Sequence, residues 1–347
     1  MPPRSQPLLA DVAKHAGVST MTVSRVLNGS DTVSVKTRAR VLEAIEQVGY
    51  VPNMLARSLA SGRSRLIGLV VWELTSSYFT EIVRGVCQEA DASGFHTVLH
   101  TSGPNQDREL GLVSSMLGGL VDGLLLVLPR NGERYVELLQ TEQLPCVLID
   151  NRALRADLPT VQATNEAGAF AATQHLIELG HRRIACITGN MQFGCGLQRL
   201  DGYRRALEEA GIPFDPALVR HGDFSQPAGY ACAQELLALS PHPTAIFASS
   251  DPMAMGVYTA AYEAGLSVPD QLSVVGFNDT PEVLQMRPRL TTVHQPIFEM
   301  GSEAVRLLQN LLDAPAASTP IVELQTHLVM RQSTAAPGHG QRRLALS

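Results

Sequence analysis

The segment 9–28, which reads LADVAKHAGVSTMTVSRVLN, constrains the fold of this chain more than any other. Its first eight residues place apolar side chains at i, i+3, i+4 and i+7, and Gly17 follows at the position where a left-handed cap is easiest. Ser19 can then cap a second helix, on which Val23 and Val26 turn inward. Two short helices joined by so tight a turn predict a helix-turn-helix.

The outward face of this second helix is a candidate for reading DNA. Thr20, Met21, Ser24 and Arg25 lie near its N-terminal end, the part of a helix-turn-helix that enters the major groove. Arg25 can contact a guanine, whereas Met21 offers only apolar contact, for example to a thymine methyl group. The alternative is an ordinary helical hairpin with a solvated polar face. We expect double-stranded operator DNA as a partner.

The charges of the chain are unevenly divided. Residues 1–65 carry nine Lys or Arg against four Asp or Glu, a balance of +5, which leaves −11 for the remainder of a chain whose net charge is −6. A cationic head can gather phosphates while an acidic body limits nonspecific adhesion, so DNA binding should depend strongly on salt. A solvated charge imbalance is the alternative.

Length and composition indicate a folded protein of several domains. A chain of 347 residues is too long for one compact core, and 45% of its residues are hydrophobic. No apolar run approaches the ~20 residues that span a bilayer, and no signal-peptide region is evident at the N-terminus. We expect no membrane partner and a cytoplasmic protein that associates with the nucleoid when bound to DNA.

Catalytic and metal-binding motifs are missing from the sequence. The five cysteines form no CxxC pair, which argues against a disulfide framework and a zinc site, and the ten histidines show no metal-ligand spacing. There is no HExxH, GxSxG or Walker motif, and no GxGxxG follows the first strand. We expect no catalytic residue, no metal and no cofactor, because analogy between folds would be the sole support for an enzymatic function.

A third helix and a short, marginal helix follow the helix-turn-helix. Residues 35–48 have helical apolar spacing and end before Gly49. The run Tyr50 to Asn53 then interrupts the helical pattern, and Asn53 can cap a helix over the stretch MLARSLASG. A helix shorter than ~12 residues rarely persists alone in water, so this one should fold only when a minor groove or a second copy supports it.

The rest of the chain alternates apolar runs with helical segments. The first set of runs covers 66–72, 95–100, 123–128 and 146–150, and the second covers 183–188, a segment near 218, 245–249 and 272–277. This alternation predicts two parallel α/β sheets, hence two lobes and a cleft. Ligands of such sheets bind outside the carboxyl ends of strands, so loops after Trp72, Leu128, Thr188, Ser249 and Phe277 should line the cleft.

The runs DVAKHAGVSTMTVSRVLNG and VSVKTRARVLEAIEQVGYVPNMLARSLASGRSRLIGLVV closely resemble the lactose and galactose repressor (LacI/GalR) family, and the similarity continues to about residue 332. The resemblance implies an N-terminal all-α helix-turn-helix headpiece followed by an α/β two-lobed effector domain like a periplasmic binding protein. It also implies a hinge helix, about 53–61, that folds in the minor groove when a dimer meets a palindromic operator.

The resemblance assigns roles to headpiece residues. Leu59 matches a leucine that wedges into the central base step and kinks the DNA, although it could also be a packing residue. Thr20, Met21 and Arg25 match base-reading positions. Residues that match phosphate contacts, with capping or packing as the alternative for each, are Ser19, Asn28, Tyr50 and Asn53.

Domain boundaries follow from the same resemblance. We expect a headpiece over 1–62 and an effector-binding and dimerisation domain over 65–332. The N-lobe is expected at 65–162 and 292–321, and the C-lobe at 163–290 and 322–332, with crossings near 162, 291 and 322. The segment 333–347 lacks the leucine heptads that build a tetramer, so it is expected to be a flexible tail on a homodimer.

Candidate effector-binding residues lie in the predicted cleft. Tyr78 and Phe79 begin the helix after the first strand, and Phe224 resembles an aromatic platform for a sugar or base ring. Arg199 matches an arginine that relatives aim at ligand hydroxyls or carboxylates. Ser250 and Asn278 follow strands and can supply hydrogen bonds. Asn278 stands where many relatives have Asp, and Ser250 where several have Asn, so the pattern indicates no particular sugar.

The sequence therefore predicts a transcriptional regulator, most readily a repressor, that a small metabolite such as a sugar or sugar derivative controls. The effector and the operator would be coupled because each prefers one arrangement of the lobes and hinge helices. A regulator or activator that depends on a purine or another corepressor is the first alternative. A small-molecule-binding protein of the transport type or an enzyme, either without a DNA function, is the second.

Overall fold

The structure, a computed structural model, describes residues 7–27, 30, 32–50, 63–103, 106–117, 120–129, 144–150, 158–314 and 320–338. The chain divides into two compact units, Met1–Ser64 and Arg65–Ser347. Within the described parts, no helix is both long enough and apolar enough to cross a membrane.

The first unit is a small three-helix headpiece. Its helices are α1 (Leu9–Ala16), α2 (Thr20–Leu27) and α3 (Val35–Val48), all three as the sequence predicts. Gly17 and Gly49 end α1 and α3 with φ of 61° and 67°, the left-handed conformation that glycine adopts without strain. One apolar stripe from each helix forms the core, which centres on Val12, Val23 and Val41.

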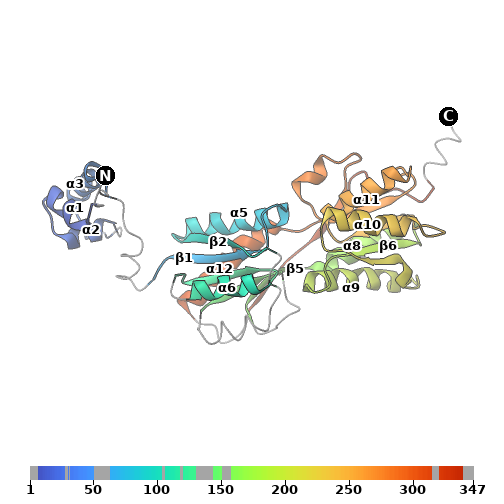
Figure 1. Cartoon of the computed structure of the whole chain (residues 1–347), viewed down its shortest axis with the longest axis horizontal. Helices are drawn as coiled ribbons and strands as arrows, with labels where there is room; N and C mark the ends of the chain where they lie inside the picture. Colours follow the sequence, from blue (N-terminus) through green and yellow to red (C-terminus); the bar gives the residue numbers. More distant parts are fainter. Residues whose placement is uncertain are drawn as a thin grey trace. The chain divides into compact units, whose positions relative to one another are not determined.

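The second unit contains two six-stranded sheets, as the alternating pattern predicts (Figure 1). The first sheet has the order β11-β5-β4-β3-β1-β2, and its neighbouring strands all run parallel. Its strands are β1 (Leu66–Val71), β2 (His96–Thr101), β3 (Gly123–Val127), β4 (Cys146–Ile149), β5 (Thr160–Ala163) and β11 (Ile321–Leu324). Helices α5 (Ser77–Ala92) and α12 (Ile297–Asp313) pack on one face, and α6 (Gln106–Leu117) packs on the other.

The second sheet has the order β12-β10-β9-β8-β6-β7, in which only the pair β10 and β12 is antiparallel. Its strands are β6 (Ile184–Thr188), β7 (Val219–His221), β8 (Ala245–Ala248), β9 (Ser273–Asn278), β10 (Thr291–His294) and β12 (His327–Val329). Helices α8 (Asn165–Glu178) and α9 (Gly194–Glu209) cover one face, and α10 (Gln226–Leu237) and α11 (Asp251–Glu263) cover the other. Two short 3-10 helices are η1 (Pro216–Leu218) and η2 (Pro281–Leu284).

The chain passes between the sheets three times, at positions somewhat later than the sequence indicates. It leaves the first sheet after β5, returns after β10 and leaves again after β11. The strands place these crossings at 164, 295–296 and 325–326 rather than near 162, 291 and 322. The difference arises because β10 pairs with β9 as far as His294, and β11 pairs with β5 as far as Leu324.

The segment after residue 332 is partly built into the second lobe, so the prediction of a flexible tail from 333 onward was wrong for its beginning. Ser333 is fully buried, and its Oγ accepts a hydrogen bond of 2.7 Å from the backbone amide of Thr291. The amide of Ala335 donates to Ser273 Oγ at 3.0 Å. These bonds satisfy the backbone amides of Thr291 and Ala335 at the start of β10 and beside the start of β9, which anchors the chain as far as Ala335. Residues 339–347 and the helix predicted at 132–140 lie outside the described residues.

Candidate functional sites

The predicted DNA-reading face of α2 is open to solvent. Thr20, Met21 and Arg25 are exposed, and Ser24 is half-buried. Met21 exposes 63% of its surface, although apolar side chains on a packed helix normally turn inward. The opposite face of α2 is buried in the headpiece core, so the helix can contact another molecule without losing its packing.

Two of the four candidate phosphate contacts have roles within the headpiece, and the other two lie outside the described residues. Ser19 Oγ accepts a 3.2 Å hydrogen bond from the amide of Thr22, which makes Ser19 the N-cap of α2. Tyr50 is half-buried and packs against the headpiece core. Asn28, Asn53 and Leu59 lie outside the described residues.

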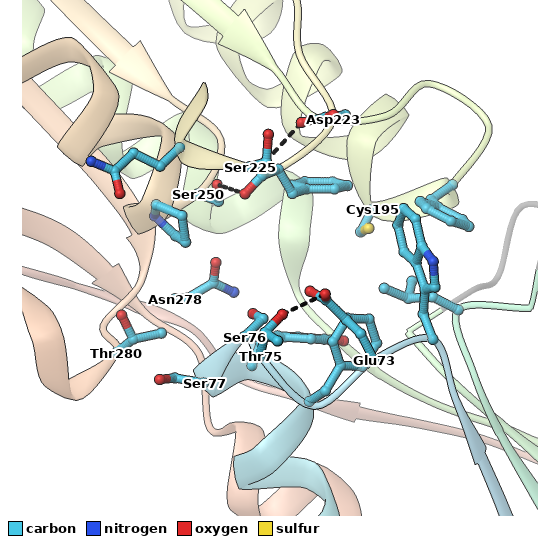
Figure 2. Close-up of a pocket in the computed structure, with 18 of the residues that line it drawn as sticks. Glu73, Thr75, Ser76, Ser77, Cys195, Asp223, Ser225, Ser250, Asn278 and Thr280 are labelled. Atoms are coloured by element: carbon cyan, nitrogen blue, oxygen red, sulfur yellow. Dashed lines mark hydrogen bonds between the residues drawn. The ribbon is translucent and has the colours of Figure 1, made fainter. Parts of the chain in front are cut away.

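A cavity of about 600 Å³ lies between the two lobes, at the carboxyl ends of strands from both sheets (Figure 2). All six residues predicted to hold an effector line it: Tyr78, Phe79, Arg199, Phe224, Ser250 and Asn278. Trp72, Leu128 and Ser250 reach it from the loops expected after their strands. Phe193 and Cys195, at the start of α9, line it from the loop after β6.

Arg199 is buried and held on three sides. Its Nε donates to Asn165 Oδ1 at 2.9 Å, its Nη1 to the Ser249 carbonyl at 2.7 Å, and its Nη2 to Gln295 Oε1 at 3.0 Å. The guanidinium carbon also lies 3.7 Å from the centre of the Phe277 ring. The guanidinium therefore has a fixed orientation before any ligand arrives.

Asp150, which follows β4 in the first lobe, is the acidic counterpart of Arg199. Its carboxylate accepts from the Tyr78 hydroxyl at 3.0 Å, from Asn165 Nδ2 at 3.0 Å and from Gln295 Nε2 at 3.1 Å. Asn165 and Gln295 thus each bridge Asp150 to Arg199. Both amides lie at crossings between the lobes, so one buried network joins the cavity wall to two of the three segments in which the chain passes from one lobe to the other.

Tyr78 is held as a hydrogen-bond donor in this network. Burial raises the pKa of its hydroxyl well above 10.0, and the negative charge of Asp150 raises it further, whereas Arg199 lowers it. The phenol consequently keeps its proton at neutral pH and continues to donate to Asp150.

Backbone strain is concentrated around the cavity. Among the described residues, six other than glycine have a positive φ, and four of them line the cavity: Leu128, Asp150, Phe224 and Asn278. Phe224, with φ of 75°, presses its ring against Gly189, where a Cβ would lie 1.9 Å from a ring atom. Such conformations persist where the surrounding structure enforces them, and they are typical of ligand sites.

The hydrogen bonds of Asn278 explain why an amide suits this position better than a carboxylate. Its Nδ2 donates to Gln295 Oε1 at 2.7 Å, the same oxygen that receives the bond from Arg199. A carboxylate could accept but not donate here, so Asp at this position would place two acceptor oxygens against each other.

The side of the cavity near Ser77 carries a direct hydrogen bond between the lobes. Ser77, the first residue of α5, donates from its Oγ to Glu282 Oε1 in η2. Burial alone would raise the pKa of Glu282, but hydrogen bonds from Ser77, its own backbone and Thr280 outweigh burial and lower it. Glu282 is therefore an anion at neutral pH.

The sequence interpretation missed several wall residues. Asp150 directly follows the apolar residues CVLI, the same signal that identified Ser250 and Asn278. Glu73, Asp223 and Glu282 also line the cavity, but each lies in a loop or a short 3-10 helix whose path the sequence does not specify. No group of three or more His, Cys, Asp or Glu that could hold a metal ion occurs among the residues with described positions.

Two family descriptions match this chain. Residues 8–53 match the bacterial regulatory proteins of the lacI family, and residues 173–334 match the periplasmic binding protein-like domain.

Curated relatives are similar over nearly the whole chain. Catabolite control protein A of Priestia megaterium is 37% identical over 325 residues, which cover 93% of this chain and 98% of that protein. The HTH-type transcriptional regulator CelR of Thermobifida fusca is 39% identical over 340 residues, which cover 95% and 99%.

Solved structures agree in fold. The lac repressor dimer bound to operator and an anti-inducer matches with a TM-score of 0.87 and 30% identity, covering 96% of this chain and 100% of that one. The complex of the transcriptional regulator CelR with cellobiose matches with a TM-score of 0.74 and 36% identity, covering 94% and 100%.

Proposed function

Because this chain belongs to the lacI family of bacterial regulatory proteins, we propose that it represses transcription from a palindromic operator and that a sugar or sugar derivative in the cavity controls its affinity for DNA. It is a DNA-binding transcription regulator rather than an enzyme. We propose that it acts in the cytoplasm and is associated with the nucleoid while bound to DNA.

The headpiece supplies the DNA contacts in this proposal. Thr20, Met21, Ser24 and Arg25 contact base edges in the major groove, which the exposure of Thr20, Met21 and Arg25 on α2 supports. Leu59 enters the minor groove between base steps. The phosphate contacts come from Ser19, Asn28, Tyr50 and Asn53.

A homodimer is the functional unit in this proposal. One helix-turn-helix covers half of a palindromic site, so two copies related by a two-fold axis are needed to cover it. The similar lac repressor is a dimer on its operator. We assign residues 1–62 to the headpiece with its hinge helix and 65–335 to effector binding and dimerisation, because the bonds of Ser333 and Ala335 extend the second lobe beyond residue 332.

One observation carries the proposed effector site: six residues chosen from the sequence line a single cavity between the lobes. Tyr78, Phe79 and Phe224 offer ring faces, and Arg199, Ser250 and Asn278 offer polar groups. The similar CelR regulator binds cellobiose, which favours a sugar as the ligand class.

The mechanism is thermodynamic linkage between the cavity and the operator. A ligand that contacts both lobes favours one lobe arrangement, and the buried network of Asp150, Asn165, Arg199 and Gln295 joins the cavity to the crossing segments. Coupling of this kind typically amounts to about 1–3 kcal/mol.

The test begins with selection of DNA from a random duplex library by the full chain. We expect enrichment of an inverted repeat, with half-sites about one helical turn apart. Sedimentation should show a dimer on this DNA. Enrichment of unrelated sequences, or binding by a concentration-independent monomer, would contradict the proposal.

A further inference from the structure

The wall of the cavity is acidic. Four carboxylates line it, those of Glu73, Asp150, Asp223 and Glu282, and Arg199 is the one Lys or Arg among the described lining residues. Asp150 is linked to Arg199 through two amides, so the charges of this pair balance locally. Three carboxylates then remain in the wall without an opposing cation that lines it.

Arg199 has little capacity left for an anionic ligand. Three of the five N–H donors that a guanidinium carries are already bound to Asn165, Ser249 and Gln295. A bidentate bond to a phosphate or carboxylate needs two parallel donors free on the same edge, which this arrangement restricts. An anion in the cavity would thus be repelled by three carboxylates, and Arg199 would have few free N–H donors to bind it.

The neutral part of the wall suits a polyhydroxyl compound. Aromatic rings line it at Trp72, Tyr78, Phe79, Phe193 and Phe224. Hydroxyl groups line it at Thr75, Ser76, Ser77, Ser225, Ser250 and Thr280. Ring faces pack against the apolar faces of sugar rings, while hydroxyls and carboxylates accept hydrogen bonds from sugar hydroxyls.

The cavity has two ends with different chemistry. Ser77, Asn278 and Thr280 lie at one side, and Glu73 and Cys195 lie at the other (Figure 2). Trp72 directly precedes Glu73 and Phe193 lies two residues before Cys195, so both rings line the cavity toward this second end, with their centres 6.4 Å apart. A volume of about 600 Å³ lies well within the ~300–1,000 Å³ of sites for drug-sized ligands, which exceed a single sugar ring in size.

We propose that the effector of this chain is an uncharged oligosaccharide of at least two rings, and that the wall carboxylates of Glu73, Asp223 and Glu282 exclude phosphorylated and acidic sugars. One ring occupies the polar end beside Asn278, and the next lies against Trp72 and Phe193. This inference rests on the proposed effector function of the same cavity.

The test uses Trp72, the only tryptophan of the chain, as a reporter in the cavity wall. Its fluorescence is followed while the full-length protein is titrated with a library of neutral di- and trisaccharides that includes cellobiose, maltose, lactose and trehalose. Thermal shift in parallel detects binding that leaves the fluorescence unchanged. Each disaccharide that binds is compared with its 6-phosphate ester, and glucose and hypoxanthine are titrated separately.

We expect at least one neutral oligosaccharide to bind, its phosphate ester to bind about tenfold or more weakly, and glucose to bind more weakly than the disaccharide. The double variant E73Q/D223N should bring the affinities for the two matched sugars closer together, because it removes two wall charges. E208Q, on the exposed face of α9, is the matched control and should leave their ratio unchanged.

The outcomes separate this inference from the proposed function. Tighter binding of a phosphate ester, glucose or hypoxanthine than of every neutral oligosaccharide, or no binding of any neutral oligosaccharide, would overturn the ligand class. If such a compound still changed operator affinity, the regulator function would stand. A bound oligosaccharide that left operator affinity unchanged would support the ligand class and contradict effector control.

Discussion

In the proposed function, the headpiece and the cavity perform recognition in opposite ways. The reading face of α2 presents neighbouring side chains on one short helix, which is supported by a core from residues 9–50. The cavity wall combines residues from Trp72 to Glu282, held by a buried hydrogen-bond network. One surface is local and exposed, whereas the other is assembled from both lobes.

This difference predicts different consequences of substitution. On α2, a changed side chain alters one contact with DNA and leaves the fold of the headpiece intact. In the cavity, a changed side chain leaves buried partners unsatisfied and alters stability, ligand binding and coupling together. The substitutions below test that contrast, beginning with the largest expected effect.

Replacement of Arg199 by methionine should have the largest effect. It removes a buried cation of similar length, and Asp150 loses the charge that balances it through Asn165 and Gln295. We expect the second unit to lose about 3 kcal/mol of its free energy of unfolding, measured by urea denaturation. The exposed control Arg204→Met should change it by no more than about 0.5 kcal/mol. Equal losses of unfolding free energy from the two substitutions would show that the buried cavity network is no more sensitive to substitution than an exposed position.

Asp251 should make the second lobe sensitive to pH. Burial raises its pKa from 3.8 to about 7, although bonds from Thr292 and Thr280 oppose the rise. Between pH 3.8 and 7 the folded state therefore holds a proton that the unfolded state has released, so stability falls as pH rises through this window and is level above it.

The corresponding measurement compares the wild type with Asp251→Asn at pH 5 and pH 8. When the pH is raised from 5 to 8, the free energy of unfolding of the wild type should fall by about 2–4 kcal/mol more than that of the variant, since asparagine does not titrate. Parallel pH profiles for the two proteins would show that Asp251 does not titrate in this range.

Arg25→Ala tests the local character of the reading helix. We expect operator affinity to fall by about 1–3 kcal/mol and discrimination at one base pair to relax. The thermal transition and the Trp72 titration should stay as in the wild type, because Arg25 is exposed. Arg84→Ala, an exposed residue of α5, is the control for loss of positive charge. An equal loss of affinity for every DNA sequence would indicate a phosphate contact instead.

Ser34→Ala should have the smallest effect, and one confined to the headpiece. Ser34 caps α3, since its Oγ accepts a 3.3 Å bond from the amide of Thr37. The free energy of unfolding of the headpiece, measured in its own transition, should fall by about 1 kcal/mol. Ser34→Asn should keep most of this stability because asparagine also caps helices. A shift in the transition of the second unit would mean that the two units do not unfold separately.

Local signals in the sequence account for most of the fold. Helices of the headpiece follow from apolar spacing and from Gly17 and Gly49, and long apolar runs predict the central strands of both sheets. The sequence interpretation did not identify the short strands β5, β10, β11 and β12, because none of them contains an uninterrupted apolar run such as CVLI in β4 or AIFA in β8. It also missed α12, although the apolar residues of this helix recur at helical spacing. Ser333 was assigned to a tail because its buried bonds are made with residues distant in the chain.

Positions in the cavity could be predicted, but their interactions could not. A residue directly after a buried strand signals the carboxyl edge of a sheet, which identified Ser250 and Asn278. The bridges through Asn165 and Gln295 depend on how the two lobes meet, and no spacing in the sequence encodes them. The acidic wall likewise emerges only when loops from both lobes come together.

The central claim is that occupation of the cavity changes affinity for the operator. The most direct measurement is operator binding by the full chain with and without a saturating neutral oligosaccharide, with saturation verified by Trp72 fluorescence. We predict a change of about tenfold in the dissociation constant, which corresponds to about 1.4 kcal/mol of coupling. Identical dissociation constants with the cavity empty and fully occupied would contradict the account.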